Sequence, residues 1–312
     1  MSLEPNFDGP GGALRNVVAA VVTYNPDTSL GPNLEALRAQ VDTVLVIDNG
    51  STNIAFVERT VLAAGCRMVA NMANLGIASA LSQAARLAQS EGFDWLATFD
   101  QDSLIRPRSI AGLLKLYEAH PQRDRIGVLA MARRDRGTGR DYHFRWDILE
   151  ETPVWRSVRT TITSGSLVRV TAFETVGLFD DKLFIDSVDH EFCLRCRSHG
   201  LLVIEGLLQV MDHSVGNSRN VRLFWLRVSC ANQNAMRRYY ITRNQLEVLR
   251  RYFFSDFVWC FNHVFLLIFS NILVIFYEQH RLAKVGATLA GVRDFLLRRF
   301  GPRQQMAPSR AS

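Results

Sequence analysis

The chain has 312 residues, enough to bury the core of one large domain or of two. Its formal net charge is +6, yet residues 219–312 hold 15 Lys and Arg against 4 Asp and Glu, so an acidic body precedes a basic end. The basic end also contains the apolar run 253–277, more aliphatic surface than nucleic-acid-binding arms carry, so nucleic acid is not the expected partner. Five scattered cysteines argue against a disulfide framework and indicate a reducing cytosol.

Strand and helix signals alternate in the first half of the chain. We expect strands at 17–24, 43–48, 67–70, 95–100 and 126–131, and helices at 33–40, 53–64, 77–90 and 108–119. The strand segments are continuous apolar runs, as in parallel strands buried on both faces. Repeated units of this kind predict an α/β fold with a doubly wound, mostly parallel, Rossmann-like sheet.

The second half is less regular. Residues 133–145 have loop character, 160–170 is strand-like, 188–199 is helical and 201–205 is a strand, and a helical, aromatic and basic pattern starts at 223. We therefore expect four parts: a flexible N-terminus without a secretory signal (1–14), an α/β domain (15–220), a helical region (221–302) and a disordered tail (303–312).

Two carboxylates follow the fourth expected strand directly. Asp100 and Asp102 are separated by one residue, so in extended chain they project to the same side. Hard oxygen ligands suit Mg²⁺ or Mn²⁺, which share their remaining coordination positions with substrate phosphates. The pair predicts a metal-held diphosphate at the sheet edge, and the alternative is two solvated acids in a turn.

Polar residues also follow the earlier strands, where parallel sheets bind ligands. Asp48 could accept a hydrogen bond from the imino N–H of a uracil or thymine ring, or could serve as a cap or turn acid. Asn74 precedes the Ala-rich helix and could meet an anion or a sugar, or mark a plain loop-to-helix junction. The glycine patterns of dinucleotide folds and P-loops are absent after the first strand.

Two further segments carry groups suited to proton transfer or metal binding. Asp189 lies near a predicted helix start and could act as a general base, with Glu191 orienting its neighbours. Both could instead be first-turn acids that stabilise the helix dipole. His213 follows a strand-like run and could complete the metal shell begun by Asp102, or be structural.

Taken in order, these segments resemble a known family. They are YNP (24–26), IDNGS (47–51), NLGIASALS (74–82), DQDS (100–103), SGS (164–166), FIDSVDHEFCLR (184–195) and HSVGNS (213–218). The series resembles the inverting nucleotide-sugar glycosyltransferases of family 2, which have the GT-A fold. The residues of its motifs are most similar to those of bacterial rhamnosyltransferases that use dTDP-L-rhamnose. The resemblance covers roughly residues 17–245.

The resemblance implies a role for each matching residue. The residues implied at the nucleotide-sugar donor are Thr23, Tyr24, Asn25, Asp48, Asn49, Ser51, Asn74, Gly76 and Asp100, with Arg243 facing the diphosphate. The implied ligands of the Mg²⁺ or Mn²⁺ cofactor are Asp102 and His213, together with Asp100. Asp189 matches the catalytic base, although Val188 replaces the Glu common before it.

The apolar run with its basic flanks favours a membrane surface as a further partner. Four polar residues interrupt it: Asp256, Asn262, His263 and Asn271. They favour a helix or hairpin lying in the interface over a clean span, the alternative being a buried helix pair. We expect a peripheral or monotopic enzyme on the cytoplasmic face of the inner membrane, acting on a lipid-linked saccharide. Alternatives are a UDP-galactofuranose or UDP-glucose donor, an aspartate-nucleophile phosphatase, and a non-catalytic membrane-bound relative.

Overall fold

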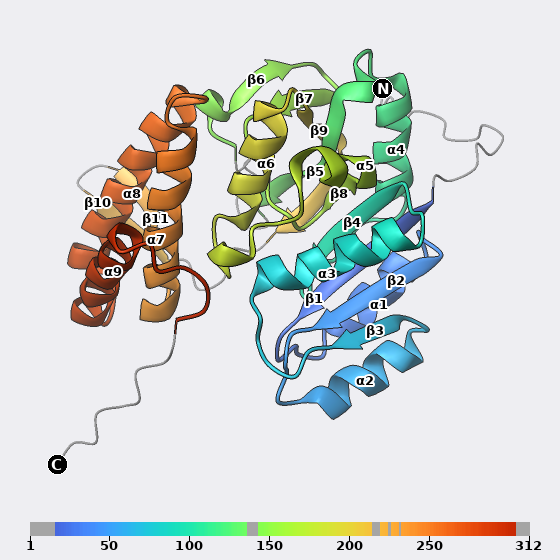
Figure 1. Ribbon diagram of the computed structural model, residues 1–312, viewed down its shortest axis with the longest axis horizontal. Helices are drawn as coiled ribbons and strands as arrows, with labels where there is room; N and C mark the ends of the chain where they lie inside the picture. Colours follow the sequence, from blue (N-terminus) through green and yellow to red (C-terminus); the bar gives the residue numbers. More distant parts are fainter. Residues whose placement is uncertain (1–15, 136–142, 214–218, 224–225, 231, 304–312) are drawn as a thin grey trace.

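The computed structural model describes residues 16–135, 143–213, 219–223, 226–230 and 232–303. Within them a nine-stranded sheet has the order β3-β2-β1-β4-β8-β5-β9-β7-β6 (Figure 1). Its strands are β1 (Val17–Thr23), β2 (Thr43–Asp48), β3 (Arg67–Ala70), β4 (Trp95–Asp100), β5 (Ile126–Asp135), β6 (Ile148–Glu151), β7 (Trp155–Val158), β8 (Ser166–Arg169) and β9 (Leu202–His213).

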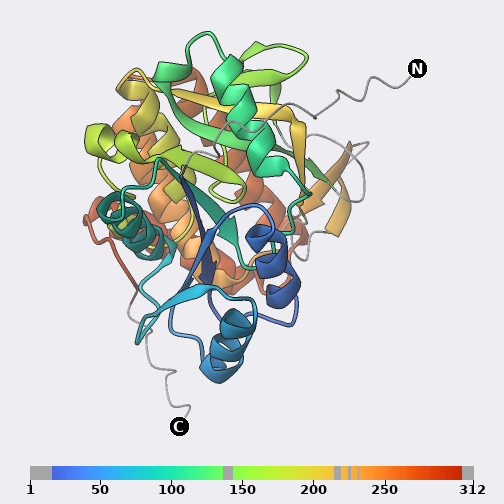
Figure 2. The same ribbon diagram turned by 90° about the vertical axis from the view of Figure 1, so that its right-hand side faces the viewer.

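Helices cover both faces of this sheet. They are α1 (Leu30–Arg38), α2 (Ile54–Ala63), α3 (Ile77–Ser90), α4 (Ser109–Ala119), α5 (Val170–Val176) and α6 (Val188–Ser198), with 3-10 turns at Arg123–Arg125, Arg145–Asp147 and Asp181–Leu183. Successive residues of β1 point to opposite faces: Val21 packs in the core with α1, α2 and α4, and Val22 in the core with α3, α5 and α6. Figure 2 shows the blue α1 and α2 and the teal α3 on opposite sides of the strands. The predicted doubly wound α/β architecture is confirmed.

The prediction of a mostly parallel sheet is only half right. Strands β3, β2, β1 and β4 run parallel, and β5 pairs parallel with β9. However, β8 is antiparallel to both β4 and β5, and β6 and β7 add antiparallel pairs at the other edge. The sheet is therefore mixed, because β4, α4 and β5 continue the βα series, but β8 is inserted antiparallel between β4 and β5.

The expected strand at 160–170 is also wrong over most of its length. Only 166–169 pairs in the sheet, and α5 follows immediately. Residues 160–165 cross the end of β4 as a loop, where the carbonyl oxygen of Thr163 accepts a hydrogen bond from Thr98 Oγ1 at 2.6 Å. The backbone N–H of Asp100 donates to Ser164 Oγ at 3.1 Å. These side-chain bonds replace strand pairing and fix the loop beside Asp100.

A hairpin and three helices complete the described chain. The hairpin is β10 (Arg219–Leu223) with β11 (Leu226–Cys230), and the helices are α7 (Ala235–Tyr252), α8 (Phe257–Tyr277) and α9 (Arg281–Leu296). Helical structure thus starts at Ala235 instead of in the early 220s, since residues 219–223 pair antiparallel with residues 226–230. The three helices pack on one another beside α6 (Figure 1).

The turn after β2 depends on a glycine. Gly50 has φ +83°, and a Cβ atom there would lie 2.6 Å from the backbone carbon of Ala73. This close approach brings the turn against the loop that precedes α3. Gly65 offers a matched comparison, because its φ is +63° and nothing lies within 4 Å of a Cβ atom built on it.

We expect Gly50→Ala to lower the free energy of unfolding by roughly 3–4 kcal/mol, since backbone strain and overpacking add. Gly65→Ala should cost about 1–2 kcal/mol, since it carries strain alone. Urea unfolding of both variants measures the difference. Equal losses would show that the contact with Ala73 is not limiting.

Candidate active site

The carboxyl ends of β1 and β2 are joined through Asp48, which is fully buried. Its Oδ2 accepts hydrogen bonds from Thr23 Oγ1 at 2.9 Å and Ser51 Oγ at 2.5 Å. Its Oδ1 accepts from the backbone N–H groups of Gly50 at 3.1 Å and Ser51 at 2.9 Å. Four donors fill the acceptor positions of a carboxylate. Asp48 therefore stabilises the turn after β2, which was the alternative to nucleobase binding. This geometry does not support the expected contact between Asp48 and a nucleobase.

Three asparagines connect neighbouring loops at the same edge. Asn25 Oδ1 accepts from both the N–H and the hydroxyl of Thr52, each at 2.8 Å. Asn49 Nδ2 donates to Asn74 Oδ1 at 3.1 Å, and Asn74 Oδ1 also accepts from the N–H of Gly76 at 2.9 Å. The predicted donor residues thus meet at one edge of the sheet, and their amides set the spacing of its loops.

Tyr24 differs from these residues because its side chain is free to face a ligand. It is 48% exposed, whereas Thr23 before it is buried. Its backbone N–H donates to Gln101 Oε1 at 2.8 Å, which ties the end of β1 to the segment after β4. An exposed phenol ring on a fixed backbone can stack on a nucleobase.

The acidic residues expected to share the site lie together. Burial, and after it the neighbouring carboxylates of Asp102 and Asp189, raise the pKa of Asp100 to about 6, while Arg237 opposes them. Charges influence one another in this way only at short range. The acids that follow β4 and the acid that begins α6 are therefore near enough to interact electrostatically.

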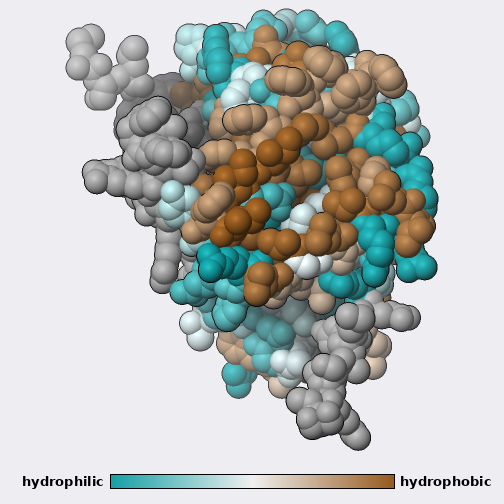
Figure 3. Space-filling view, turned by 90° about the vertical axis from the view of Figure 1, so that its left-hand side faces the viewer, coloured by the Kyte–Doolittle hydropathy of each residue, from teal (hydrophilic) through white to brown (hydrophobic). Residues whose placement is uncertain are grey.

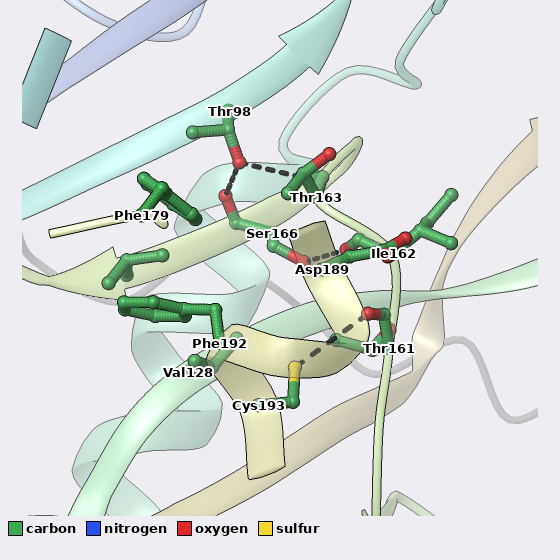
Figure 4. Close-up of a pocket in the computed structure, with 11 residues that line it drawn as sticks. Thr98, Val128, Thr161, Ile162, Thr163, Ser166, Phe179, Asp189, Phe192 and Cys193 are labelled. Atoms are coloured by element: carbon green, nitrogen blue, oxygen red, sulfur yellow. Dashed lines mark hydrogen bonds between the residues drawn. The ribbon is translucent and has the colours of Figure 1, made fainter. Parts of the chain in front are cut away.

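Asp189 lies in the first turn of α6, where its Oδ1 accepts from the N–H of His190 at 2.9 Å. Figure 4 shows it beside a pocket lined by Thr161, Ile162 and Phe192. Its carboxylate is half-buried beside apolar side chains, an environment suited to a general base. Glu191, in contrast, is buried against Arg195 and Tyr252, at 2.8 and 2.9 Å, and has a structural role.

Two residues at the site escaped sequence analysis. Asp186 precedes α6 with φ +64°, burial raises its pKa to about 6, and no donor among the described residues reaches its Oδ2. Its Oδ1 accepts from Arg237 Nε at 3.1 Å, and the Arg237 side chain is 52% exposed. Asp186 stood within the acidic motif, but nothing in the sequence connected Arg237 in α7 to it.

The expectation that Arg243 faces the diphosphate is wrong. Its side chain is buried, with Nη1 donating to the carbonyl oxygen of Gly301 at 2.8 Å and Nη2 to that of Leu183 at 3.2 Å. The guanidinium also lies 5.0 Å from the ring centre of Tyr240. With these partners Arg243 fastens α7 to the preceding domain, and Arg237 is the exposed cation near the acids.

The donor set for a metal is only partly described. No group of three His, Cys, Asp or Glu side chains in the described part of the chain could hold an ion unaided. β9 ends at His213, whose side chain lies outside the described residues. Asp100 and Asp102 nevertheless fit a hard divalent cation, because a positive charge would stabilise the ionised form of Asp100, which burial and the neighbouring carboxylates disfavour. Phosphate oxygens of a substrate would supply further ligands.

Comparisons with known proteins show the family of the chain. The profile described as glycosyl transferase family 2 matches residues 18–177. The chain is 30% identical over 293 residues to the dTDP-rhamnosyl transferase RfbF of Shigella flexneri, covering 89% of this chain and 96% of that protein.

Solved structures show a similar fold. The S. aureus TarS fragment 1-349 in complex with UDP-GlcNAc superposes with a TM-score of 0.59 at 14% identity, covering 90% of this chain and 80% of that one. GalNAc-T7 with UDP, GalNAc and Mn²⁺ superposes with a TM-score of 0.54 at 13% identity, covering 76% of this chain and 48% of that one. At these identities the likeness concerns the fold alone.

We expect Asp100→Asn to stabilise the metal-free protein at pH 8. The carboxyl titrates near 6 when folded and near 4 when unfolded, so wild-type stability falls as pH rises through this window. The gain should be about 1–3 kcal/mol at pH 8 and should vanish near pH 4. Urea unfolding in EDTA measures it, with exposed Asp124→Asn as the control. A gain of equal size at both pH values would contradict charge repulsion as its cause.

Proposed function

Because the chain belongs to glycosyl transferase family 2, we propose that it transfers L-rhamnose from dTDP-L-rhamnose to a hydroxyl group of a lipid-linked or polysaccharide acceptor. The convergence of Asp100, Asp102 and Asp189 at the sheet edge carries the proposal. Similarity to a dTDP-rhamnosyl transferase along almost the whole chain supports the choice of sugar. UDP-galactofuranose and UDP-glucose remain the alternative donors.

In the proposed reaction Asp189 is the general base. Its carboxylate removes the proton from the acceptor hydroxyl, whose oxygen attacks the anomeric carbon of the donor. The bond from that carbon to the diphosphate oxygen breaks on the opposite face, so the configuration inverts and the nucleoside diphosphate leaves. Tyr24, half exposed at the end of β1, is placed to contact the nucleoside.

Charge at the leaving group is the second requirement. Asp100 and Asp102 would hold a divalent cation, which when bound supplies positive charge to the diphosphate. Arg237 adds a cation from the side of α7, where it is already paired with Asp186. Together these groups favour departure of the nucleoside diphosphate over its retention.

We also propose that α8 binds the cytoplasmic face of the inner membrane. It is a 21-residue helix, long and apolar enough by composition to cross a bilayer. Two of its polar residues contact neighbouring helices: His263 Nδ1 lies 2.8 Å from Gln245 Nε2, and Asn271 Oδ1 accepts from Thr288 Oγ1 at 3.0 Å. Because of these contacts, His263 and Asn271 do not expose unpaired polar groups to lipid, which would be unfavourable.

The outward face of α8 is apolar. Its exposed side chains include Phe257, Phe261, Phe265, Ile268, Ile272 and Phe276. Figure 3 shows broad brown areas on this side of the molecule. A helix packed on α7 and α9 along one side and apolar along the other fits a helix lying in the membrane interface better than a separate span.

A donor panel with Mg²⁺ tests the transfer reaction. We expect nucleotide release to be fastest with dTDP-L-rhamnose and a lipid-diphosphate saccharide, and to fall on addition of EDTA. Asp189→Asn should lower kcat about 1000-fold or more, since the base is lost. The exposed Glu174→Gln in α5 is the matched control. Full activity of Asp189→Asn would refute its role, and a faster rate with a UDP-sugar would refute rhamnose.

Vesicle sedimentation tests the membrane proposal. The double variant Phe261→Asp/Phe265→Asp should bind anionic phospholipid vesicles at least about tenfold more weakly, because two exposed rings lose their apolar environment. Leu62→Asp, at an even more exposed apolar site on α2, should bind as the wild type does. Equal binding by all three proteins would place the anchor elsewhere.

A further inference from the structure

The segment that leads into α6 has an unfavourable backbone. Phe184, Asp186 and Ser187 all have positive φ, at +65°, +64° and +62°. None is glycine, and side chains at such angles meet the neighbouring backbone. Three such residues within four positions do not keep this shape unaided, so surrounding contacts must hold it.

Asn244 of α7 provides the closest of these contacts. Its Nδ2 lies 2.7 Å from the carbonyl oxygen of Leu183, 2.7 Å from that of Ile185 and 3.1 Å from that of Asp186. The side chain is fully buried, so water does not compete for these bonds. One amide group therefore gathers three carbonyl oxygens of the strained segment on one side.

Arg243 determines which way that amide points. Its Nε donates to Asn244 Oδ1 at 2.9 Å, which leaves the Nδ2 hydrogens directed at residues 183–186. Its Nη2 reaches the carbonyl oxygens of Lys182 and Leu183 at 3.3 and 3.2 Å. The two adjacent residues of α7 thus act as one unit, which we call the α7 clamp.

On its opposite side, the segment contacts the start of α3. The backbone N–H of Ala78 lies 3.4 Å from the carbonyl oxygen of Phe184. A Cβ atom on Gly76 would lie 2.5 Å from the same oxygen. Residues 183–187 are therefore wedged between the start of α3 and the α7 clamp, two residues before the proposed base.

We propose that Asn244 is a positioning residue for the transfer reaction. By holding residues 183–187 it sets the start of α6, and with it the Asp189 carboxylate relative to Asp100 and Asp102. This role rests on the proposed function, because it concerns the same base. It makes the C-terminal helices part of the catalytic apparatus as well as a proposed membrane anchor.

Kinetics of two Asn244 variants in the full-length protein test the role. Asn244→Asp keeps the shape but has no N–H to donate, and Asn244→Ala removes both. Both should lower kcat about 100-fold, as small displacements of a catalytic group do, with the donor KM within about threefold of wild type. Thr242→Val, which removes one buried hydroxyl from the same helix, is the matched control and should change neither.

Hydrogen exchange supplies a second readout that needs no turnover. Both Asn244 variants should exchange amide hydrogens faster in residues 183–190 and unchanged in β1 and β2. Wild-type kcat in Asn244→Asp, or unchanged exchange there, would overturn the proposal. If the wild type releases nucleotide from none of the donors, the proposed function fails, and faster exchange in the variants would still show the clamp.

Discussion

Burial of a carboxylate beside other carboxylates, at the carboxyl edge of the sheet, is the constraint on which the site depends. Asp100, Asp102 and Asp189 come from two distant parts of the chain and lie close enough for the last two to raise the pKa of the first. Such a cluster is unfavourable in the absence of a cation. It persists because the elements that carry it are fixed by unrelated contacts, and its charge suits the divalent cation that we propose for the reaction.

Each side of the cluster has its own support. On the donor side Asp48 uses all its acceptor positions to hold the turn after β2, so the loops keep their spacing without a ligand. On the base side Asn244 holds the strained segment before α6. Asp48, which the sequence suggested as a ligand contact, thus stabilises the backbone around the site, as Asn244 does.

The sequence predicted elements best where the pattern was local. β2, β3, α3 and β4 were predicted with the bounds that the structure shows, because uninterrupted apolar runs and an Ala-rich amphipathic stretch are sufficient signals. The loop at 160–165 was taken for a strand because its composition is β-branched, yet side-chain bonds to Thr98 and Asp100 replace strand pairing there. The direction of β8 could not be read, since one short apolar run pairs equally well either way.

What the sequence determined by itself was the series of motifs, and hence the family, the α/β architecture and the carboxylates that carry charge. Tertiary structure decided which of two nearby arginines can contact a substrate beside the acidic residues. Arg243 is enclosed by carbonyl oxygens and aromatic rings, whereas Arg237, six residues earlier, is paired with Asp186. Residue type and spacing are the same kind of signal for both. Only the packing of α7 against residues 181–187 separates them, because burial depends on contacts between segments about 60 residues apart.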